Sequence, residues 1–223
     1  MGLAAAVRSV GRWASGPRPW PEPDDLPWRS VSFAVVDVET TGLDLRRDEV
    51  ISIGVVPVVG GRIAAGRWYQ VVRPDRAITP ASMKVHTLTP DEVATAPRLD
   101  EMLDALHGVL YGRVVVAHAA WVERGFLDRA LRVRGERLPD GLVDTAALAR
   151  AVGLRAPGSR EPDLEELAAE LGLPVHTPHH ALGDAMTTAE VLLVLATRLE
   201  DAVDGDLTVR DLVRLTKRHP LAG

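Results

Sequence analysis

The segment Asp37-Val38-Glu39-Thr40-Thr41-Gly42 follows a largely apolar run at residues 31–36, and this combination constrains the fold more than any other part of the chain. The run predicts a buried β-strand over residues 31–38. Residues two apart in a strand point to the same face, so the carboxylates of Asp37 and Glu39 are expected to lie side by side. Two such buried charges are costly unless a cation neutralises them or one carboxyl stays protonated, and divalent ions with oxygen ligands are the usual solution. The alternative is a surface strand end with two solvated acids, which this segment alone does not exclude.

The composition is that of an ordinary globular protein and not that of a basic sheath for nucleic acid. The 223 residues carry a net charge of -5 and include no cysteine, which excludes disulfides and thiolate metal sites. An acidic metal site can still bind a polyanion locally, because the ions and nearby arginines carry positive charge. No apolar run is long enough to span a membrane, and the first residues match neither a secretion nor a myristoylation signal. We therefore expect a cytoplasmic protein without a membrane partner.

Residues 1–29 differ from the rest of the chain because tryptophan alternates with proline. The tryptophans are Trp13, Trp20 and Trp28, and the prolines are Pro17, Pro19, Pro21, Pro23 and Pro27. Proline at this density precludes a helix or a central strand. This N-terminal extension either docks a partner or wraps on its own domain with the tryptophans in surface grooves, and we favour the second interpretation. One large domain is expected at residues 30–202, and a C-terminal tail with a short helix at residues 203–223.

The order of the apolar patterns predicts an α/β domain. Strands are expected at residues 31–38, 49–59, 62–72, 113–117 and 142–144. Helices are expected from Thr89, where a capping signal occurs, and at residues 99–110, 121–134, 145–152, 163–171 and 180–199. Because the first three strands follow one another and the later ones alternate with helices, we expect a mixed five-stranded sheet flanked by helices.

Three further residues are candidates for the same site as the two strand acids. His179 and Asp184 would differ by about 140° on a helix, so they converge only if His179 precedes the helix, held there by Thr177-Pro178. Asp184 shares a largely apolar helix face, where an acid usually has a specific partner. Glu123 lies near the start of the helix after the strand at residues 113–117. The alternatives are a structural His–Asp pair and an acid that complements the helix dipole.

Together these residues resemble the three signature blocks of the DnaQ-like DEDDh 3′–5′ exonucleases, a family that includes the proofreading epsilon subunit of bacterial DNA polymerase III. The blocks are Asp-x-Glu-Thr-Thr-Gly from Asp37, Val-Ala-His at residues 116–118 with an acid five residues after the histidine, and His-x-x-x-x-Asp from His179. The resemblance covers residues 31–199. It implies an RNase H-like fold, a role in DNA repair or proofreading, and a polymerase or repair factor as a partner.

The resemblance also implies a metal-dependent phosphodiesterase. Two divalent ions, Mg²⁺ or Mn²⁺, would clamp the attacking and leaving oxygens of an in-line displacement. Asp37 would bridge both ions, and Glu39 and Asp184 would each support one. Glu123 would be the remaining metal ligand. His179 would take the proton from the attacking water, because a histidine pKa lies near neutrality.

The chain departs from the family pattern at Glu123, where the family has aspartate, and at Ala119, where it has asparagine. Glutamate is longer by one methylene, and a misplaced ligand of this kind can cost about 100-fold in rate. From the sequence we expect a modest gain in rate for Glu123→Asp. A weakly active or inactive nucleic-acid-binding module is the alternative.

Substrate contacts are also carried over from the family. The backbone of Thr40, Thr41 and Gly42 is implied to approach the terminal nucleotide, and His86 to lie near the 3′ end. The expected substrate is single-stranded DNA with a free 3′ end, and a 3′–5′ exoribonuclease that trims RNA is the second interpretation. Arginines at positions 124, 129, 132 and 134 would reach phosphates, although a solvated helix face is the more usual meaning of such a run.

Overall fold

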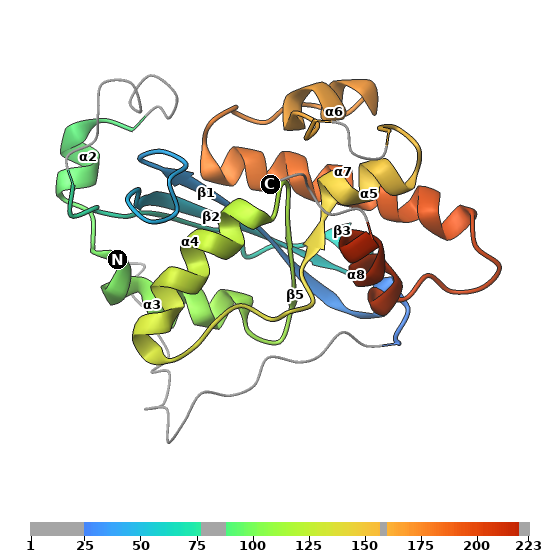
Figure 1. Cartoon of the computed structure of the whole chain (residues 1–223), viewed down its shortest axis with the longest axis horizontal. Helices are drawn as coiled ribbons and strands as arrows, with labels where there is room; N and C mark the ends of the chain where they lie inside the picture. The colour runs from blue at the N-terminus through green and yellow to red at the C-terminus, as the bar shows by residue number, and fades with distance from the viewer. Residues whose placement is uncertain (1–24, 77–87, 157–159, 219–223) are drawn as a thin grey trace, which may run out of the picture.

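A mixed β-sheet separates two layers of helices in the computed structural model, which describes residues 25–76, 88–156 and 160–218 (Figure 1). The strands are β1 (Ser32–Thr40), β2 (Val50–Val59), β3 (Arg62–Ile63), β4 (Trp68–Val71), β5 (Val114–Ala117) and β6 (Val143–Asp144). The helices are α2 (Pro90–Ala94), α3 (Leu99–Leu110), α4 (Trp121–Leu131), α5 (Thr145–Ala151), α6 (Leu164–Glu170), α7 (Ala181–Asp201) and α8 (Val209–Arg218), with 3-10 turns at Trp28–Ser30 and Arg132–Arg134.

The sheet order is β3-β2-β1-β5-β6, and β4 also pairs with β2. β1 and β2 are antiparallel, whereas β5 is parallel to β1 and β6 is parallel to β5. The predicted α/β class and mixed sheet are confirmed, but the sheet has six strands and not five. The predicted strand at residues 62–72 is two strands, because Gly66 takes a left-handed φ of 92° between β3 and β4. Each of the two pairs with a different part of β2.

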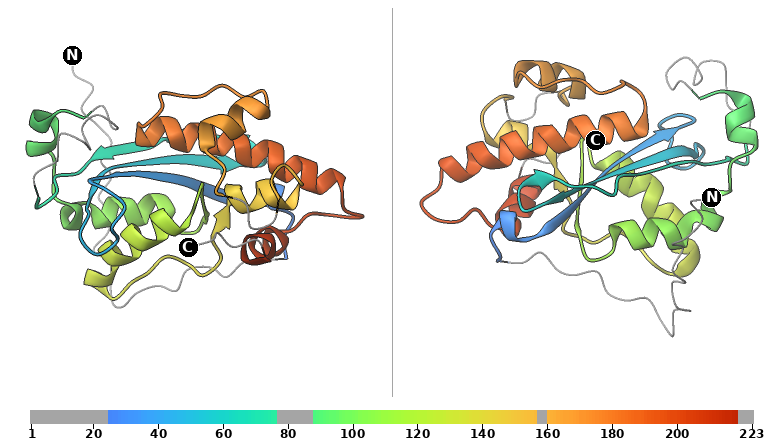
Figure 2. Two further views of the ribbon diagram at one scale, coloured as in Figure 1. Left: turned by 45° about the horizontal axis from the view of Figure 1, so that its top comes forward. Right: turned by 180° about the vertical axis from the view of Figure 1, so that it is seen from behind.

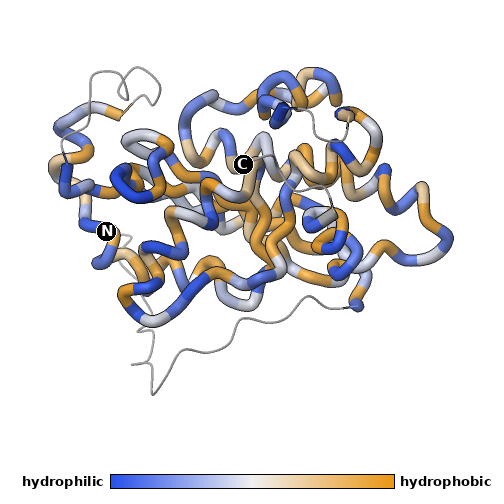
Figure 3. Tube along the Cα trace, in the orientation of Figure 1, coloured by the Kyte–Doolittle hydropathy of each residue, from blue (hydrophilic) through white to orange (hydrophobic). Residues whose placement is uncertain are grey.

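The alternation of side chains along β1 builds two cores, one on each face of the sheet. Phe33 and Val35 pack with α7 and the other C-terminal helices in one core. Val36 and Val38 pack with α3 and α4 in the other. Figure 2 shows the long helix α7 across one face of the sheet and α3 with α4 on the opposite face. The apolar residues concentrate along the strands between these layers (Figure 3). Asp37 and Glu39 continue the Phe33 and Val35 series, so their side chains point toward α7.

The described part of the N-terminal segment packs against the last helices. Trp28 is fully buried in the core beneath α7, and its indole N–H donates to Glu200 Oε1 at 3.1 Å. The Trp28 backbone N–H donates to the Leu207 carbonyl, and Pro27 forms a β-bridge with Thr208. Trp28 therefore links the N-terminal segment to the end of α7 and to the segment before α8. Trp13 and Trp20 lie outside the described residues. No helix in the ranges described above is long and apolar enough to cross a bilayer.

Candidate active site

Three carboxylates converge where β1 meets the start of α7. Carboxylate oxygens of Asp37, Glu39 and Asp184 all lie within 4.8 Å of one another, and the three side chains are partly buried. The two β1 acids share a face, as the two-residue period of the strand predicts, and Asp184 comes from the first turn of α7. Oxygen atoms from three acids are a donor set that suits a hard divalent cation.

Helix α7 reaches β1 because β2 has a glycine at the crossing point. Gly54 is the register partner of Asp37 across the β1–β2 ladder. A Cβ atom at Gly54 would lie 2.3 Å from the Ala181 carbonyl oxygen and 2.5 Å from the Leu182 amide nitrogen. Any side chain at position 54 would therefore push the start of α7 away from the sheet. The glycine thus sets the separation between Asp184 and the strand acids.

Burial and mutual repulsion make protonation of this cluster easier. Burial and then the nearby Asp184 raise the pKa of Glu39 to about 7. Burial raises the pKa of Asp184 to about 6, although the backbone N–H and imidazole of His179 oppose the shift. The pKa of Asp37 is raised well above its usual value by burial and by the charges of Glu123, Asp184 and Glu39. A bound cation would offset both the lost hydration and the repulsion, so the cluster is built for positive charge.

Glu123 approaches Asp37 from the opposite layer of helices. β1 and β5 pair only from Phe33 to Val35, so the two strands diverge before Asp37. The side chain of Glu123, on the first turn of α4, is 3% exposed. Burial raises its pKa, whereas the backbone N–H groups of Glu123 and Val38 donate to the carboxylate and lower the pKa. Its Oε2 atom is buried without a hydrogen-bond partner in the described residues.

The structure therefore brings Glu123 to the site but not into the cluster of Asp37, Glu39 and Asp184. Within the described residues, that cluster of three is the one whose oxygens are mutually within 4.8 Å. The charge of Glu123 acts on Asp37 from behind β1. An unpartnered carboxylate oxygen at this point is consistent with a cation that the three-acid cluster shares with Glu123.

The start of α4 is held by two residues that the sequence did not single out as site residues. Asp144, almost fully buried, accepts the Ala119 and Ala120 backbone N–H groups at 3.2 Å each and also caps α5 at Ala146 at 2.8 Å. His118 contacts Thr145 Oγ1 through Nδ1 at 2.8 Å. These contacts fix the turn from which Glu123 projects. The signal that could have found Asp144 was its place between a strand end and a helix start, which is typical of an N-cap.

Ala119 occupies the left-handed region, with a φ of 57°. This conformation disfavours most residues with a Cβ atom but suits asparagine and glycine. It gives a backbone reason for the asparagine of the family pattern at this position, a reason that does not involve substrate.

His179 precedes α7, as the spacing to Asp184 predicts, because the helix begins at Ala181. Its backbone has a left-handed φ of 57°, and its N–H donates to Asp184 Oδ2 at 3.0 Å. The imidazole is more than half exposed, and its Nε2 lies 3.7 Å from Glu165 Oε1 on α6. The neighbouring His180 instead stacks on Tyr69, with ring centroids 4.4 Å apart. His179 is therefore the histidine that solvent can reach next to the carboxylates.

The Thr-Thr-Gly turn follows a β-bulge between Glu39 and Thr40. Thr40 Oγ1 donates to the Gly42 carbonyl at 2.7 Å, and Thr41 Oγ1 donates to Asp48 Oδ1 at 3.0 Å. A Cβ atom at Gly42 would lie 2.5 Å from the Asp48 carboxylate, so a larger residue here would displace the side chain that accepts from Thr41. The bulge and these bonds place the turn beside the carboxylates. His86 lies outside the described residues.

Comparisons with known proteins show which family the chain resembles in sequence. The family profile for exonucleases (RNase_T) matches residues 34–192. The chain is similar to a DNA polymerase III subunit epsilon-like protein of Rhodobacter capsulatus, with 37% identity over 180 residues that make up 79% of this chain and 25% of the relative. It is also similar to the DNA polymerase III subunit epsilon of Treponema pallidum, with 36% identity over 168 residues, 74% of this chain and 76% of the relative. The chain thus spans about a quarter of the first relative.

Solved structures show the same architecture. "Exonuclease X in complex with 5′ overhanging duplex DNA" aligns with a TM-score of 0.64 and 27% identity, covering 82% of this chain and 99% of that one. Exonuclease I of E. coli in complex with a dT13 oligonucleotide aligns with a TM-score of 0.63, covering 77% of this chain and 42% of that one. At 14% identity, the second match shows the fold alone.

Proposed function

Because the chain belongs to the DnaQ-like exonuclease family, we propose that it hydrolyses phosphodiester bonds from the 3′ end of single-stranded DNA with a divalent metal. The observation that carries the proposal is the convergence of Asp37, Glu39 and Asp184 from two distant segments of the chain. Folding alone gives no reason to gather three repelling carboxylates, since each loses hydration on burial. Two relatives named for polymerase III epsilon support a proofreading or repair role beside a polymerase.

The residues fit a metal site of the kind that the family uses. Asp37, Glu39 and Asp184 would hold Mg²⁺ or Mn²⁺ as a pair of ions, with Asp37 shared, and Glu123 would contribute its unpartnered oxygen. When bound, the metal supplies Lewis-acid stabilisation of the negative charge on the reacting phosphate. The carboxylates have to be ionised to bind it, and their raised pKa values mean that metal and protons compete for the same oxygens.

His179 is the proposed general base. Its exposed imidazole can take a proton from a water molecule at the edge of the carboxylate cluster and release it to solvent. The bond from its backbone N–H to Asp184 keeps the base and an acid of the cluster at a fixed separation. Glu165, 3.7 Å from Nε2, would stabilise the imidazolium that forms.

Substrate positioning is assigned to the turn after β1. The backbone of Thr40, Thr41 and Gly42 would meet the terminal nucleotide, supported by the bonds from Thr41 to Asp48. His86 would lie near the 3′ end. These roles follow the family and are proposals for this chain.

The test uses 5′-labelled single-stranded DNA and RNA oligonucleotides of the same sequence, with Mg²⁺ or Mn²⁺. The wild-type chain should produce a ladder that shortens from the 3′ end, faster on DNA than on RNA. Asp37→Ala should abolish the ladder, whereas Asp204→Ala, which removes an exposed acid after α7, should not. A ladder that persists unchanged in Asp37→Ala would refute the proposed site, and faster cleavage of RNA would make the chain an exoribonuclease.

A further inference from the structure

Six arginines gather around one groove in a chain whose net charge is negative. The groove has a volume of about 480 Å³ and is lined by the loop before β2, the segment after β4, and the facing ends of α3 and α4. We call it the arginine groove. Its charged lining residues are Arg46, Arg47, Arg73, Arg76, Arg98, Arg129, Glu49, Asp75 and Asp100. Among the described residues of the lining, six cations against three anions leave an excess of three positive charges.

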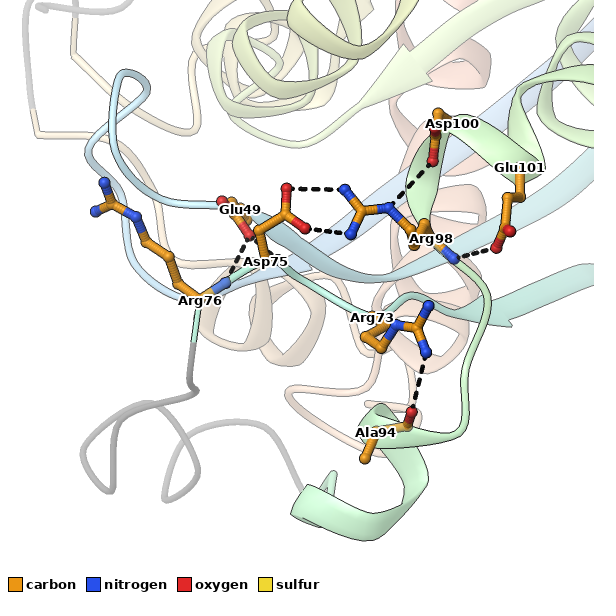
Figure 4. A network of polar contacts seen from close by, with 8 residues as sticks. All are labelled: Glu49, Arg73, Asp75, Arg76, Ala94, Arg98, Asp100 and Glu101. Atoms are coloured by element: carbon orange, nitrogen blue, oxygen red, sulfur yellow. Dashed lines mark hydrogen bonds and ion pairs between the residues drawn. The ribbon is translucent and has the colours of Figure 1, made fainter.

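Of the acids that line the groove, two pair with Arg98, and outside the lining Asp44 lies 3.8 Å from the exposed guanidinium of Arg47. Asp75 pairs with Arg98 through both carboxylate oxygens, one of them at 2.9 Å, and Asp100 lies 3.7 Å from the same guanidinium. Glu49 Oε2 instead accepts the backbone N–H of Asp75 at 2.6 Å. Figure 4 shows the guanidinium of Arg76 directed away from the Asp75–Arg98 pair.

Two more arginines bond only to neutral carbonyls, so they hold the walls of the groove without losing charge. Arg73 donates to the Ala94 carbonyl at 3.4 Å (Figure 4). Arg129 donates to the Leu45 carbonyl at 2.7 Å and to the Asp48 carbonyl. Both arginines therefore link segments of the groove wall and keep their positive charge.

The arginine groove directly adjoins the Thr-Thr-Gly turn of the carboxylate site. Glu49, at the edge of the groove, exchanges two bonds with Thr41: its N–H donates to Thr41 Oγ1 at 3.0 Å, and its carbonyl accepts the Thr41 N–H at 2.9 Å. Arg46 and Arg47 belong to the same loop. A polyanion that ends at the carboxylates would thus meet the arginines on crossing this loop.

Apolar residues line part of the groove. They are Val50, Val72, Leu99, Ala130 and Val133, of which Val50 and Val72 are buried and Val133 is 77% exposed. Apolar residues with a cationic rim suit a single nucleic-acid strand, whose phosphates are anionic and whose sugars and bases have apolar faces. An acidic peptide would bind the arginines of the rim but would make fewer contacts with the apolar residues.

We propose that the arginine groove binds the phosphodiester backbone of the strand that is degraded, on the 5′ side of the nucleotides held at the carboxylates. The inference rests on the proposed function for its substrate, and it adds a second binding site that sets how tightly long strands are held. Arg46, Arg47, Arg73, Arg76 and Arg129 would contact phosphates, and Arg98 with Asp75 would position the wall.

The test measures binding without cleavage. Full-length protein carrying Asp37→Asn is titrated with a 5′-fluorescein dT oligonucleotide of about 20 nucleotides, and fluorescence anisotropy is followed over a range of salt concentrations. The groove pair Arg46→Gln with Arg76→Gln is compared with a control pair, Arg62→Gln with Arg198→Gln. The control pair removes the same charge from exposed positions on β3 and α7. Thermal melts confirm that both double variants are folded.

We expect the groove pair to weaken binding roughly tenfold at low salt and to reduce the slope of log K against log salt by about 1.4, which is about 0.7 for each lost phosphate contact with a single strand. The control pair should match the parent. Equal effects of both pairs would overturn the proposal, because they would report net charge alone. Tighter binding of a polyglutamate peptide than of the oligonucleotide would also overturn it, in favour of an acidic protein partner.

A second substrate separates this proposal from the proposed function. The 4-nitrophenyl ester of thymidine 5′-monophosphate needs the carboxylate site but has no upstream phosphates. Failure of the otherwise unmodified chain to hydrolyse both the ester and the oligonucleotide would sink the proposed function, whereas the anisotropy result would still decide the groove. A groove pair that impairs ester and oligonucleotide cleavage equally would refute a separate upstream site.

Discussion

Gly54 on β2 lies directly against Ala181, the first residue of α7, and no other residue type fits between the two backbones. We predict that Gly54→Ala displaces the start of α7 and with it Asp184 and His179. Overpacking of this kind costs about 1–3 kcal/mol, and a displacement near 1 Å at the reacting groups can cost about 100-fold in rate. Urea unfolding and exonuclease assays measure both losses.

Gly108→Ala is the matched control for this prediction. Gly108 lies inside α3, and a Cβ atom there meets no atom within 4 Å. The substitution should stabilise the chain by about 0.5–1 kcal/mol and leave activity unchanged. If Gly54→Ala behaved like Gly108→Ala, the approach of α7 to β2 would not set the site.

Glu123→Asp should lower activity, contrary to the modest gain that the sequence alone suggests. The glutamate is buried and accepts the Val38 backbone N–H. A shorter side chain would give up this bond, and a hydrogen bond to a charged group contributes about 1.5–3 kcal/mol. We expect roughly a tenfold loss of kcat/KM. A rate above that of the wild type would show that the carboxylate reaches its ligand position better from aspartate.

Metal should stabilise the chain more at high pH than at low pH. A carboxyl whose pKa is raised by folding binds its proton more tightly in the folded state, so the free energy of unfolding falls as the pH rises through that pKa. For Glu39 and Asp184, with folded pKa values of about 7 and about 6, the metal-free chain should lose stability as the pH rises from about 4 to about 7. The Tm measured at pH 5 and at pH 8, with EDTA or with excess MgCl₂, tests this pH dependence.

The same melts on Glu39→Gln are the control. Removal of the Glu39 carboxyl should flatten the pH dependence and reduce the shift on adding MgCl₂. An Mg²⁺-induced rise in Tm that is equal at both pH values in the wild type would contradict competition between metal and protons.

The two tryptophans at opposite extremes of exposure should differ in their effect on stability. Trp28 is fully buried and bonds to Glu200, so Trp28→Ala should lose about 3–5 kcal/mol. Trp121 is 41% exposed at the start of α4, and Trp121→Ala should change the free energy of unfolding by about 0.5 kcal/mol or less. Equal losses in urea unfolding would mean that the N-terminal segment is not part of the folded core.

Local patterns predicted the parts of the fold that follow from periodicity. The apolar alternation along β1, the capping box of Thr89 and Glu92, and the helical spacing of residues 99–110 all correspond to the observed elements. The break between β3 and β4 was not predicted, because residues 62–72 are compatible with a strand and the division depends on the left-handed φ of Gly66.

The spacing of residues predicted only part of the carboxylate site, and tertiary packing determines the rest. A period of two placed Asp37 beside Glu39, and the start of α7 explains why His179 lies outside the helix. The position of Glu123 could not be read from the sequence, because it depends on how α4 packs against β1. The role of Asp144 at the start of α4 was also hidden, since two of its three backbone contacts, from Ala119 and Ala120, come from a segment distant in the chain.

The pairing of Asp37 with Gly54 lies within a continuous ladder from Ser32 to Glu39 that also sets which valines enter each core. A slip of one residue in β1 would turn both acids to the opposite face and expose a hydrophobic row to the wrong layer. A misregistered chain would therefore fail to fold before it could cleave anything. The same strand register therefore determines both the packing of the core and the position of the acids. A substitution that shifts the register should lower stability and activity together.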